Sequence, residues 1–336
     1  MNPTGAASAE QTSQAPSRPR VIVDCDPGHD DMFALAVAAS TCDVVGITVV
    51  AGNSPLANTE RNARIGRDLM GLESVEVHAG AAEPLAGASQ LFASQAHGRT
   101  GLDGPPERAP MRPLDGHDAV SYLVETTRAE EGLWLIAIGP LTNIALALRA
   151  DPHLRGRIAG LSVMGGSTTH GNVTQAAEFN VYFDPEAASE VFSAQIPRLL
   201  MFGLNVTHQV QAGAEMIGAL NNAATESSLF CAGLLQFSMD FNADIYGLSG
   251  AERSLARAPM HDPCAVLGVS HPELFTFAPR HVEVETTGVQ TRGITHVDER
   301  PWKIRAPGPI DANAQVAYRA DADQVLAMIL ASAISP

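Results

Sequence analysis

Four aspartates lie within eight positions near the start of the chain, and their type and spacing are suited to holding a cation. Asp24, Asp26, Asp30 and Asp31 belong to the segment VIVDCDPGHDD, which begins with an apolar run. Carboxylates this close resist joint ionisation, and a helix dipole offsets only about 0.3–1 kcal/mol per charge. A bound cation would relieve the repulsion, and ligation by oxygen atoms alone favours Ca²⁺ or Mg²⁺ over zinc.

Two other interpretations of this segment explain less of it. A solvated loop with a helix cap would use one aspartate and leave three unexplained. An EF-hand would need an acidic or amide side chain at its fifth loop position, where this chain has Gly28, and a helix before the loop in place of a strand. His29 lies inside the same turn and is expected to be exposed to solvent.

Three further segments follow the aspartate turn in a fixed order. They are AGN at 51–53, MGG with GNVTQAAEFN at 164–166 and 171–180, and HDPCA at 261–265. With the D-x-D-P-G-x-D-D pattern, they resemble the inosine-uridine type nucleoside hydrolases from residue 20 to about 330. The resemblance implies hydrolysis of the N-glycosidic bond of a ribonucleoside to ribose and free base, through an oxocarbenium-like transition state.

The resemblance also implies a metal site with one Ca²⁺ at the bottom of the pocket, bound to the ribose 2′- and 3′-hydroxyls and to a water. The implied protein ligands are Asp26, Asp31, Asp262 and the main-chain carbonyl of Ile138. Asp26 would in addition be the general base that takes a proton from the water. Asp24 would only orient the loop.

A second implied set of residues binds the sugar. Asp30 and Asn53 would contact the ribose hydroxyls, and Met164 would pack under the ring. The loop after MGG would supply the remaining contacts: Asn172 and Glu178 to the 5′-hydroxyl, and Asn180 to the ring hydroxyls.

The leaving base needs a proton donor or another form of stabilisation. His261 is the first candidate for the general acid, because imidazole titrates near neutral pH, and His97 is the second. The loop that carries His97 resembles the base-contacting segment of pyrimidine-preferring members, which favours pyrimidine nucleosides and leaves inosine open. Tyr246 is a further candidate for the base pocket, and the role of Ser249–Met260 stays undetermined.

The elements that must position these residues alternate between short apolar runs and longer helical ones. Strands are expected at 20–25, 44–51, 76–79, 133–138, 158–164 and 198–202, with helices at 30–40, 55–70, 117–131, 141–150, 185–194 and 320–333. This alternation predicts an α/β fold, an open and mostly parallel twisted sheet with helices on both faces, whose ligand binds at the carboxyl edge of the strands. The Gly- and Pro-rich stretch 80–116 is expected to be a lid or pocket wall, and 281–296 an antiparallel hairpin.

Length and composition limit the remaining possibilities. The chain has 336 residues and a formal net charge of −16, which argues against non-specific nucleic-acid binding. The sequence contains no run of about 18 apolar residues, so no membrane span is predicted. Residues 1–18 are expected to be a disordered tail and 19–336 a single domain. Scattered cysteines favour a reduced, cytoplasmic protein, and the resemblance implies a homodimer or homotetramer.

Two other functions remain as alternatives. A haloacid-dehalogenase-like phosphotransferase also has D-x-D after its first strand, but it needs Thr or Val where Gly28 stands and a downstream lysine, and Lys303 is the only lysine in the chain. A non-catalytic, calcium-dependent nucleoside-binding protein would be expected to lack the base or the acid. Both Asp26 and His261 are present, which favours the enzyme.

Overall fold

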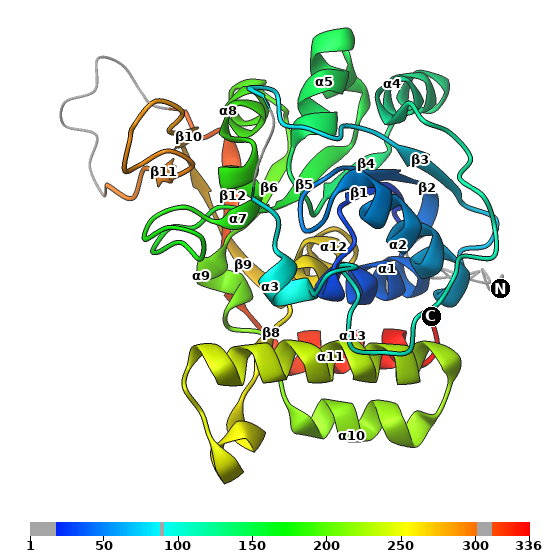
Figure 1. Ribbon diagram of the computed structural model, residues 1–336. Coiled ribbons are helices and arrows are strands. Elements are labelled where there is room, and N and C mark those ends of the chain that lie inside the picture. The colour runs from blue at the N-terminus through cyan, green and yellow to red at the C-terminus, as the bar shows by residue number, and fades with distance from the viewer. Residues whose placement is uncertain (1–17, 88–90, 301–310) are drawn as a thin grey trace, which may run out of the picture.

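The fold is built on an eight-stranded sheet, seen in a computed structural model that describes residues 18–87, 91–300 and 311–336. The strand order is β3-β2-β1-β4-β5-β6-β12-β9, and β9 pairs antiparallel with β12 while the other pairings are parallel (Figure 1). The prediction of an open, mostly parallel sheet is confirmed. Nearly all of the predicted tail lies outside the described residues.

The strands are short and mostly buried. Those of the main sheet are β1 (Arg20–Cys25), β2 (Asp43–Val49), β3 (Glu76–Ala79), β4 (Trp134–Ala137), β5 (Gly160–Met164), β6 (Leu199–Phe202), β9 (Phe275–Arg280) and β12 (Ala314–Ala320). Two small antiparallel pairs are β7 (Gln211–Ala212) with β8 (Ala258–Pro259), and β10 (Val282–Val284) with β11 (Thr295–Val297).

Helices connect the strands and cover both faces of the sheet. They are α1 (His29–Thr41), α2 (Leu56–Leu69), α3 (Ser94–His97), α4 (Ala119–Ala129), α5 (Thr142–Ala150), α6 (Leu154–Arg157), α7 (Phe179–Phe183), α8 (Pro185–Ser193), α9 (Leu204–Thr207), α10 (Ala214–Ala223), α11 (Glu226–Ile245), α12 (Asp262–Ser270) and α13 (Ala322–Ile334). Two 3₁₀ helices are η1 (Gly250–Leu255) and η2 (Pro272–Leu274).

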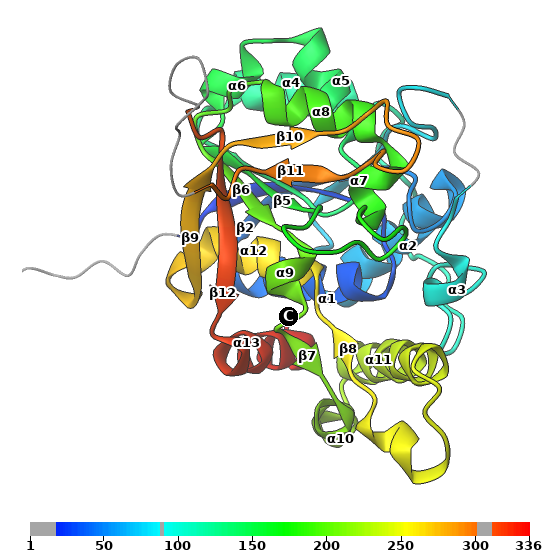
Figure 2. The same ribbon diagram turned by 90° about the vertical axis from the view of Figure 1, so that its left-hand side faces the viewer.

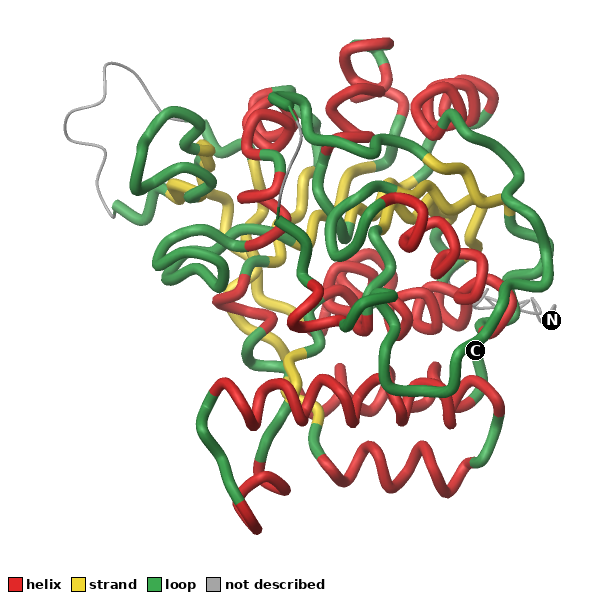
Figure 3. Tube along the Cα trace, viewed as in Figure 1, coloured by secondary structure: helices red, strands yellow, loops and turns green. Residues whose placement is uncertain are grey.

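The side chains of β1 point alternately to the two faces of the sheet and belong to two separate apolar clusters. Val21, Val23 and Cys25 join one apolar cluster with α1, α12 and α13, whereas Ile22 joins a second with α4, α5 and α8. Successive side chains of a strand point to opposite faces, so an apolar run such as RVIVDC must be covered twice. The strands form a layer between the two groups of helices, with α11 beside α13 in the lower group and α10 beyond them (Figures 1, 2 and 3).

Some elements differ from the sequence prediction. The expected hairpin exists, but its strands are three residues each and the segment between them is long. Strands β9 and β12, which lie side by side at one edge of the sheet in Figure 2, were not foreseen. Their short alternating sequences, with Pro279 in the edge strand β9, give only a weak strand signal. No helix among the described residues is long and apolar enough to cross a membrane.

Candidate active site

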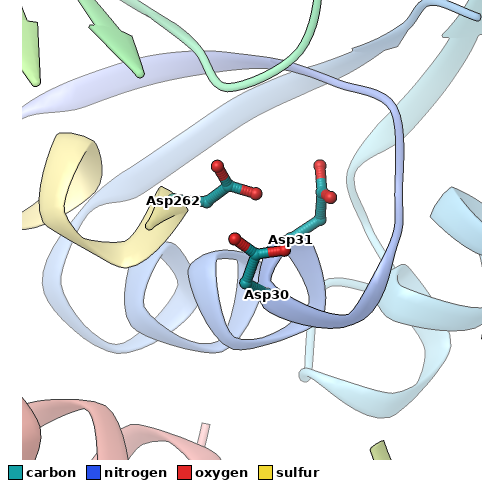
Figure 4. Close-up of side chains that lie close together, drawn as sticks. All are labelled: Asp30, Asp31 and Asp262. Carbon is teal, nitrogen blue, oxygen red and sulfur yellow. The ribbon is translucent and has the colours of Figure 1, made fainter. Parts of the chain in front are cut away.

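An acidic cluster forms where α1 and α12 begin side by side. Asp30 and Asp31 lie in the first turn of α1, and Asp262 is the first residue of α12. One carboxylate oxygen from each lies within 4.8 Å of the others, and Figure 4 shows the three side chains extending into the same space. Asp31 is fully buried and Asp262 is 3% exposed. Two helices distant in sequence therefore bring three carboxylates together.

Asp26 lies directly after β1 and is fully buried. Its Oδ2 accepts a hydrogen bond of 2.6 Å from the main-chain N–H of Asn53, while its Oδ1 has no hydrogen-bond partner among the described residues. Gly52 and Gly139 pack so closely on this carboxylate that a Cβ on either would collide with it. Sequence reasoning missed both glycines, although each follows the end of a strand, where a close backbone approach favours glycine.

Asp24 is not one of the carboxylates of the acidic cluster. Its Oδ1 accepts from the Thr48 hydroxyl at 2.6 Å and from the Asn143 amide at 2.8 Å. The four aspartates of the turn therefore do not form one group, and the third member of the cluster comes from Asp262.

Burial and mutual repulsion make the cluster hard to ionise by itself. Burial, followed by the charge of Asp31, raises the pKa of Asp26 well above its usual value. Burial and the charge of Asp30 raise the pKa of Asp31 to about 7, and burial with the neighbouring carboxylates raises that of Asp262 strongly. A divalent cation would favour the ionised forms of these carboxylates. Asp26 is not one of the three whose oxygens lie within 4.8 Å of one another, but its buried Oδ1 has no hydrogen-bond partner among the described residues. The donor set fits a hard cation.

The carbonyl of Ile138 is engaged by an amide. Asn180 donates its side-chain N–H to this carbonyl at 2.9 Å and to the Met164 carbonyl at 3.2 Å. A carbonyl oxygen has a second lone pair, so it can still ligate a cation.

Glu178 caps the short helix α7 with its side chain. The carboxylate accepts hydrogen bonds from the main-chain N–H groups of Gly166 and Asn180 at 2.9 Å and of Val181 at 3.1 Å. Burial nevertheless raises its pKa to about 7. The segment EFN is thus a helix start beside the pocket.

A pocket of about 740 Å³ opens above the cluster and has the size of a small-ligand site. Asp26 and Asp31 are buried and do not line it. The other predicted side chains do: Asp30, Asn53, Ile138, Met164, Asn172, Glu178, Asn180, His97, Tyr246, His261 and Asp262. The stretch Leu91–His97 also lines the pocket, as expected for part of the loop 80–116.

The two candidate general acids are histidines whose pKa is lowered by burial. His261 Nδ1 lies 2.7 Å from the hydroxyl of the buried Thr207, and burial lowers the pKa of His261 to about 4. Burial among protein atoms lowers the pKa of His97 to about 3.

Tyr246 is 73% exposed and reaches the pocket only at its rim. The expectation that His29 is exposed was wrong: it is 3% exposed because α3 and α11 cover it.

Known proteins match this chain over most of its length. The family model of the inosine-uridine preferring nucleoside hydrolases matches residues 21–327. The pyrimidine-specific ribonucleoside hydrolase RihA of Citrobacter koseri is 41% identical over 282 residues, covering 83% of this chain and 88% of that protein.

Solved structures agree with the sequence matches. A plant nucleoside hydrolase, PpNRh1, superposes with a TM-score of 0.86 at 26% identity, covering 95% of this chain and 100% of that one. A purine-preferring ribonucleoside hydrolase of Gardnerella vaginalis gives 0.85 at 28% identity, covering 94% and 98%.

The chain belongs to the inosine-uridine preferring nucleoside hydrolase family. It is a ribonucleoside hydrolase, an N-glycosidase that splits a ribonucleoside into ribose and free base. Neither the phosphotransferase nor the purely binding alternative has support in these matches.

Proposed function

We propose that the chain is a calcium-dependent hydrolase of pyrimidine ribonucleosides. The observation that carries this proposal is the acidic cluster beneath the pocket, together with the unpartnered Oδ1 of Asp26. These oxygen donors would be costly to bury without a cation.

The residues that would hold Ca²⁺ are Asp26, Asp31, Asp262 and the carbonyl of Ile138. When bound, the cation would supply Lewis-acid activation of a water and a hold on ribose hydroxyls. Asp26 would accept the proton of the attacking water at Oδ1, because the main-chain N–H of Asn53 occupies Oδ2. The glycines on either side of Asp26 keep its carboxylate in this orientation.

The sugar is gripped by polar groups on the pocket wall. Asp30, itself a member of the acidic cluster, and Asn53 bind ribose hydroxyls, with Met164 packed under the ring. Asn180, whose amide N–H groups are engaged by carbonyls, offers its Oδ1 to ring hydroxyls, and Asn172 and Glu178 bind the 5′-hydroxyl. Fixed carboxylates near the ring stabilise the positive charge that grows on it as the bond breaks.

Two histidines are proposed to contact the departing base. His261, positioned by Thr207, is the proposed general acid. Because burial lowers its pKa to about 4, the ring is neutral near pH 7 and would give up its remaining proton only as negative charge develops on the departing base. His97 is the second group that faces the base. Tyr246 extends the wall at the rim.

Preference for pyrimidine bases is supported by the His97 loop and by the 41% identical relative, which is a pyrimidine-specific ribonucleoside hydrolase. The ribonucleoside hydrolase of Gardnerella vaginalis, by contrast, is purine-preferring.

A panel of ribonucleosides tests the proposal, with free ribose measured before and after metal removal with EGTA. We expect uridine and cytidine to be hydrolysed faster than inosine and adenosine, deoxyuridine to be poor because it lacks a 2′-oxygen, and activity to return on adding Ca²⁺. Activity that survives EGTA would overturn the calcium assignment, and faster cleavage of inosine would overturn the base assignment.

Three broader expectations are also proposals. They are a single domain over residues 19–336, a homodimer or homotetramer, and a cytoplasmic location. The continuous sheet, which joins strands from both ends of the described chain, supports the first.

A further inference from the structure

The ring of His97 is held by the start of helix α1. His97 is the last residue of α3, and its Nδ1 accepts a hydrogen bond of 3.1 Å from the main-chain N–H of His29. A ring nitrogen that accepts carries no proton, so the proton of the neutral ring is on Nε2. Within the described residues nothing hydrogen-bonds to Nε2, and the ring lines the pocket.

His29 is fixed in turn by helix α11. Its Nδ1 lies 2.9 Å from the Ser238 hydroxyl, and its ring packs edge-on against Phe237 at 5.1 Å between centroids. The same ring meets that of His97 edge-on at 5.0 Å. Three elements, α1, α3 and α11, therefore fix one imidazole at the pocket wall.

We propose that His29 and Ser238 are positioning residues that hold His97 as the Nε2–H tautomer, so that it faces the nucleobase as a hydrogen-bond donor. The inference rests on the proposed function and adds residues to it. It favours bases with a carbonyl oxygen on the carbon next to the glycosidic nitrogen, as in uracil and cytosine but not in hypoxanthine or adenine.

The role of such a donor follows from the charge that leaves with the base. When the bond between the sugar carbon and the base nitrogen breaks, its electron pair stays on the base and spreads onto the carbonyl oxygens. A fixed N–H directed at that charge stabilises it without giving up its proton, as donors of an oxyanion hole do. The proton that the base finally accepts comes from another group, for which His261 is proposed above.

The arrangement also ties the base donor to the metal site. His29 is the residue directly before Asp30 and Asp31 in α1, so the turn that directs two carboxylates into the cluster directs its N–H at His97. Ser238, on α11, anchors this turn and also lines the pocket.

Nitrogen NMR of the whole protein, labelled with ¹⁵N histidine, tests the tautomer without any substrate. The His97 signals are assigned by their loss in His97→Asn. We expect correlations of an Nε2–H imidazole from pH 6 to pH 8 in wild type. An Nδ1–H pattern or an imidazolium in this range would overturn the proposal, even if nucleoside hydrolysis were confirmed.

Kinetics with paired variants test the donor. Glutamine can place an N–H near the position of His Nε2, whereas asparagine reaches only that of Nδ1. We expect His97→Asn to lower kcat/KM for uridine by roughly 10²–10³-fold and His97→Gln to recover part of the loss. Both should cleave p-nitrophenyl riboside nearly as wild type does, because its leaving group needs no donor. Equal losses for the two variants, or on the two substrates, would overturn the donor role.

A third set of variants tests the positioning. Ser238→Ala should lower kcat/KM for uridine by about 2–10-fold, the usual effect of one hydrogen bond, and leave p-nitrophenyl riboside unaffected. His29→Asn, which keeps a polar atom near Nδ1, should retain more uridine activity than His29→Ala. The control Ser270→Ala removes a helix hydroxyl outside the pocket and should change neither substrate. A loss shared equally by both substrates would show a merely structural role and overturn the proposal. A wild-type protein that cleaves neither substrate would instead refute the proposed function.

Discussion

Removal of Ca²⁺ should destabilise the folded protein in a way that depends on pH. The carboxylate oxygens of Asp30, Asp31 and Asp262 lie within 4.8 Å of one another. Two unit charges at that distance repel by about 3.5 kcal/mol at an effective dielectric constant of 20, so three pairs reach about 10 kcal/mol. Whole domains are stable by only about 5–15 kcal/mol. Without a cation, the cluster must therefore take up protons.

The direction of the pH effect follows from the raised pKa values. Burial and the charge of Asp30 raise the pKa of Asp31 from 3.8 to about 7, so between these values the folded state without metal binds more protons than the unfolded state. Its stability is then highest below the pKa of the unfolded carboxyl and falls as the pH rises toward 7, by up to about 1.4 kcal/mol per pH unit for each such group. Ca²⁺ needs the ionised carboxylates, so its stabilising effect grows over the same range.

Thermal unfolding and calorimetry measure this effect. At about 100 times its Kd, Ca²⁺ adds about 2.7 kcal/mol, and a chain of 336 residues has an unfolding entropy of about 0.7 kcal/mol/K, so Tm should rise by about 4 °C at pH 8. The rise should be smaller at pH 5.5, and calorimetry in two buffers should detect proton release on binding at pH 6.

A matched pair of variants tests whether the response to calcium comes from the acidic cluster or from any buried carboxylate. Asp262→Asn should weaken the calcium response, whereas Asp184→Asn should keep it, because Asp184 caps α8 and does not line the pocket. Equal Tm values with EGTA and with Ca²⁺ at pH 8, or a response that grows as the pH falls, would refute the reasoning.

Other changes have equally specific outcomes. Asp26→Ala should abolish ribose release from uridine in a folded protein, and turnover above about 1% of wild type would contradict the role of Asp26 as the base. His261→Ala should lower uridine hydrolysis by roughly 10²–10⁴-fold but spare p-nitrophenyl riboside, so similar losses on both would reject its role as the acid. Gly139→Ala should push the Asp26 carboxylate aside and weaken calcium binding in calorimetry at least about 10-fold, whereas the control Gly156→Ala, whose added Cβ meets nothing within 4 Å, should bind as wild type does. Tyr246→Ala, at a residue that is 73% exposed, should change kcat/KM for uridine less than about threefold, and a larger loss would place the ring over the bound base.

Much of the fold could be predicted from local sequence. Strand β1 and helix α1 were expected because an apolar run, a Pro-Gly turn and a helical stretch follow one another, and such patterns depend on neighbouring residues alone. Helices α10 and α11 were not assigned beforehand, because α11 is apolar over much of its surface and lacks the one-sided pattern of a surface helix. Strand β12 was missed for a related reason: it becomes a strand by pairing with β6 and β9, which are distant in sequence.

Some residues of the candidate site could likewise be selected from the sequence, whereas others are brought to the site only by the tertiary structure. Asp26 and Asp31 could be selected from sequence because acidic side chains crowded into one turn need an explanation by themselves. Asp262 was selected by resemblance alone, and only the contact between α1 and α12 brings its carboxylate to the cluster. The link from Ser238 through His29 to His97 joins three segments with no shared sequence pattern, which is why His29 was expected to be exposed.

The sequence by itself determined the chemical identity of the site: a surplus of oxygen ligands at the end of the first strand, followed by segments that can bind a sugar. Tertiary structure decided which carboxylates meet, which oxygen of Asp26 is hydrogen-bonded, and which nitrogen of His97 accepts a hydrogen bond from the backbone. The physical reason is the distance along the chain over which each effect acts. Charge crowding and strand or helix periodicity act over a few residues, whereas ligand geometry and imidazole tautomers are set by hydrogen bonds between elements that folding alone brings together.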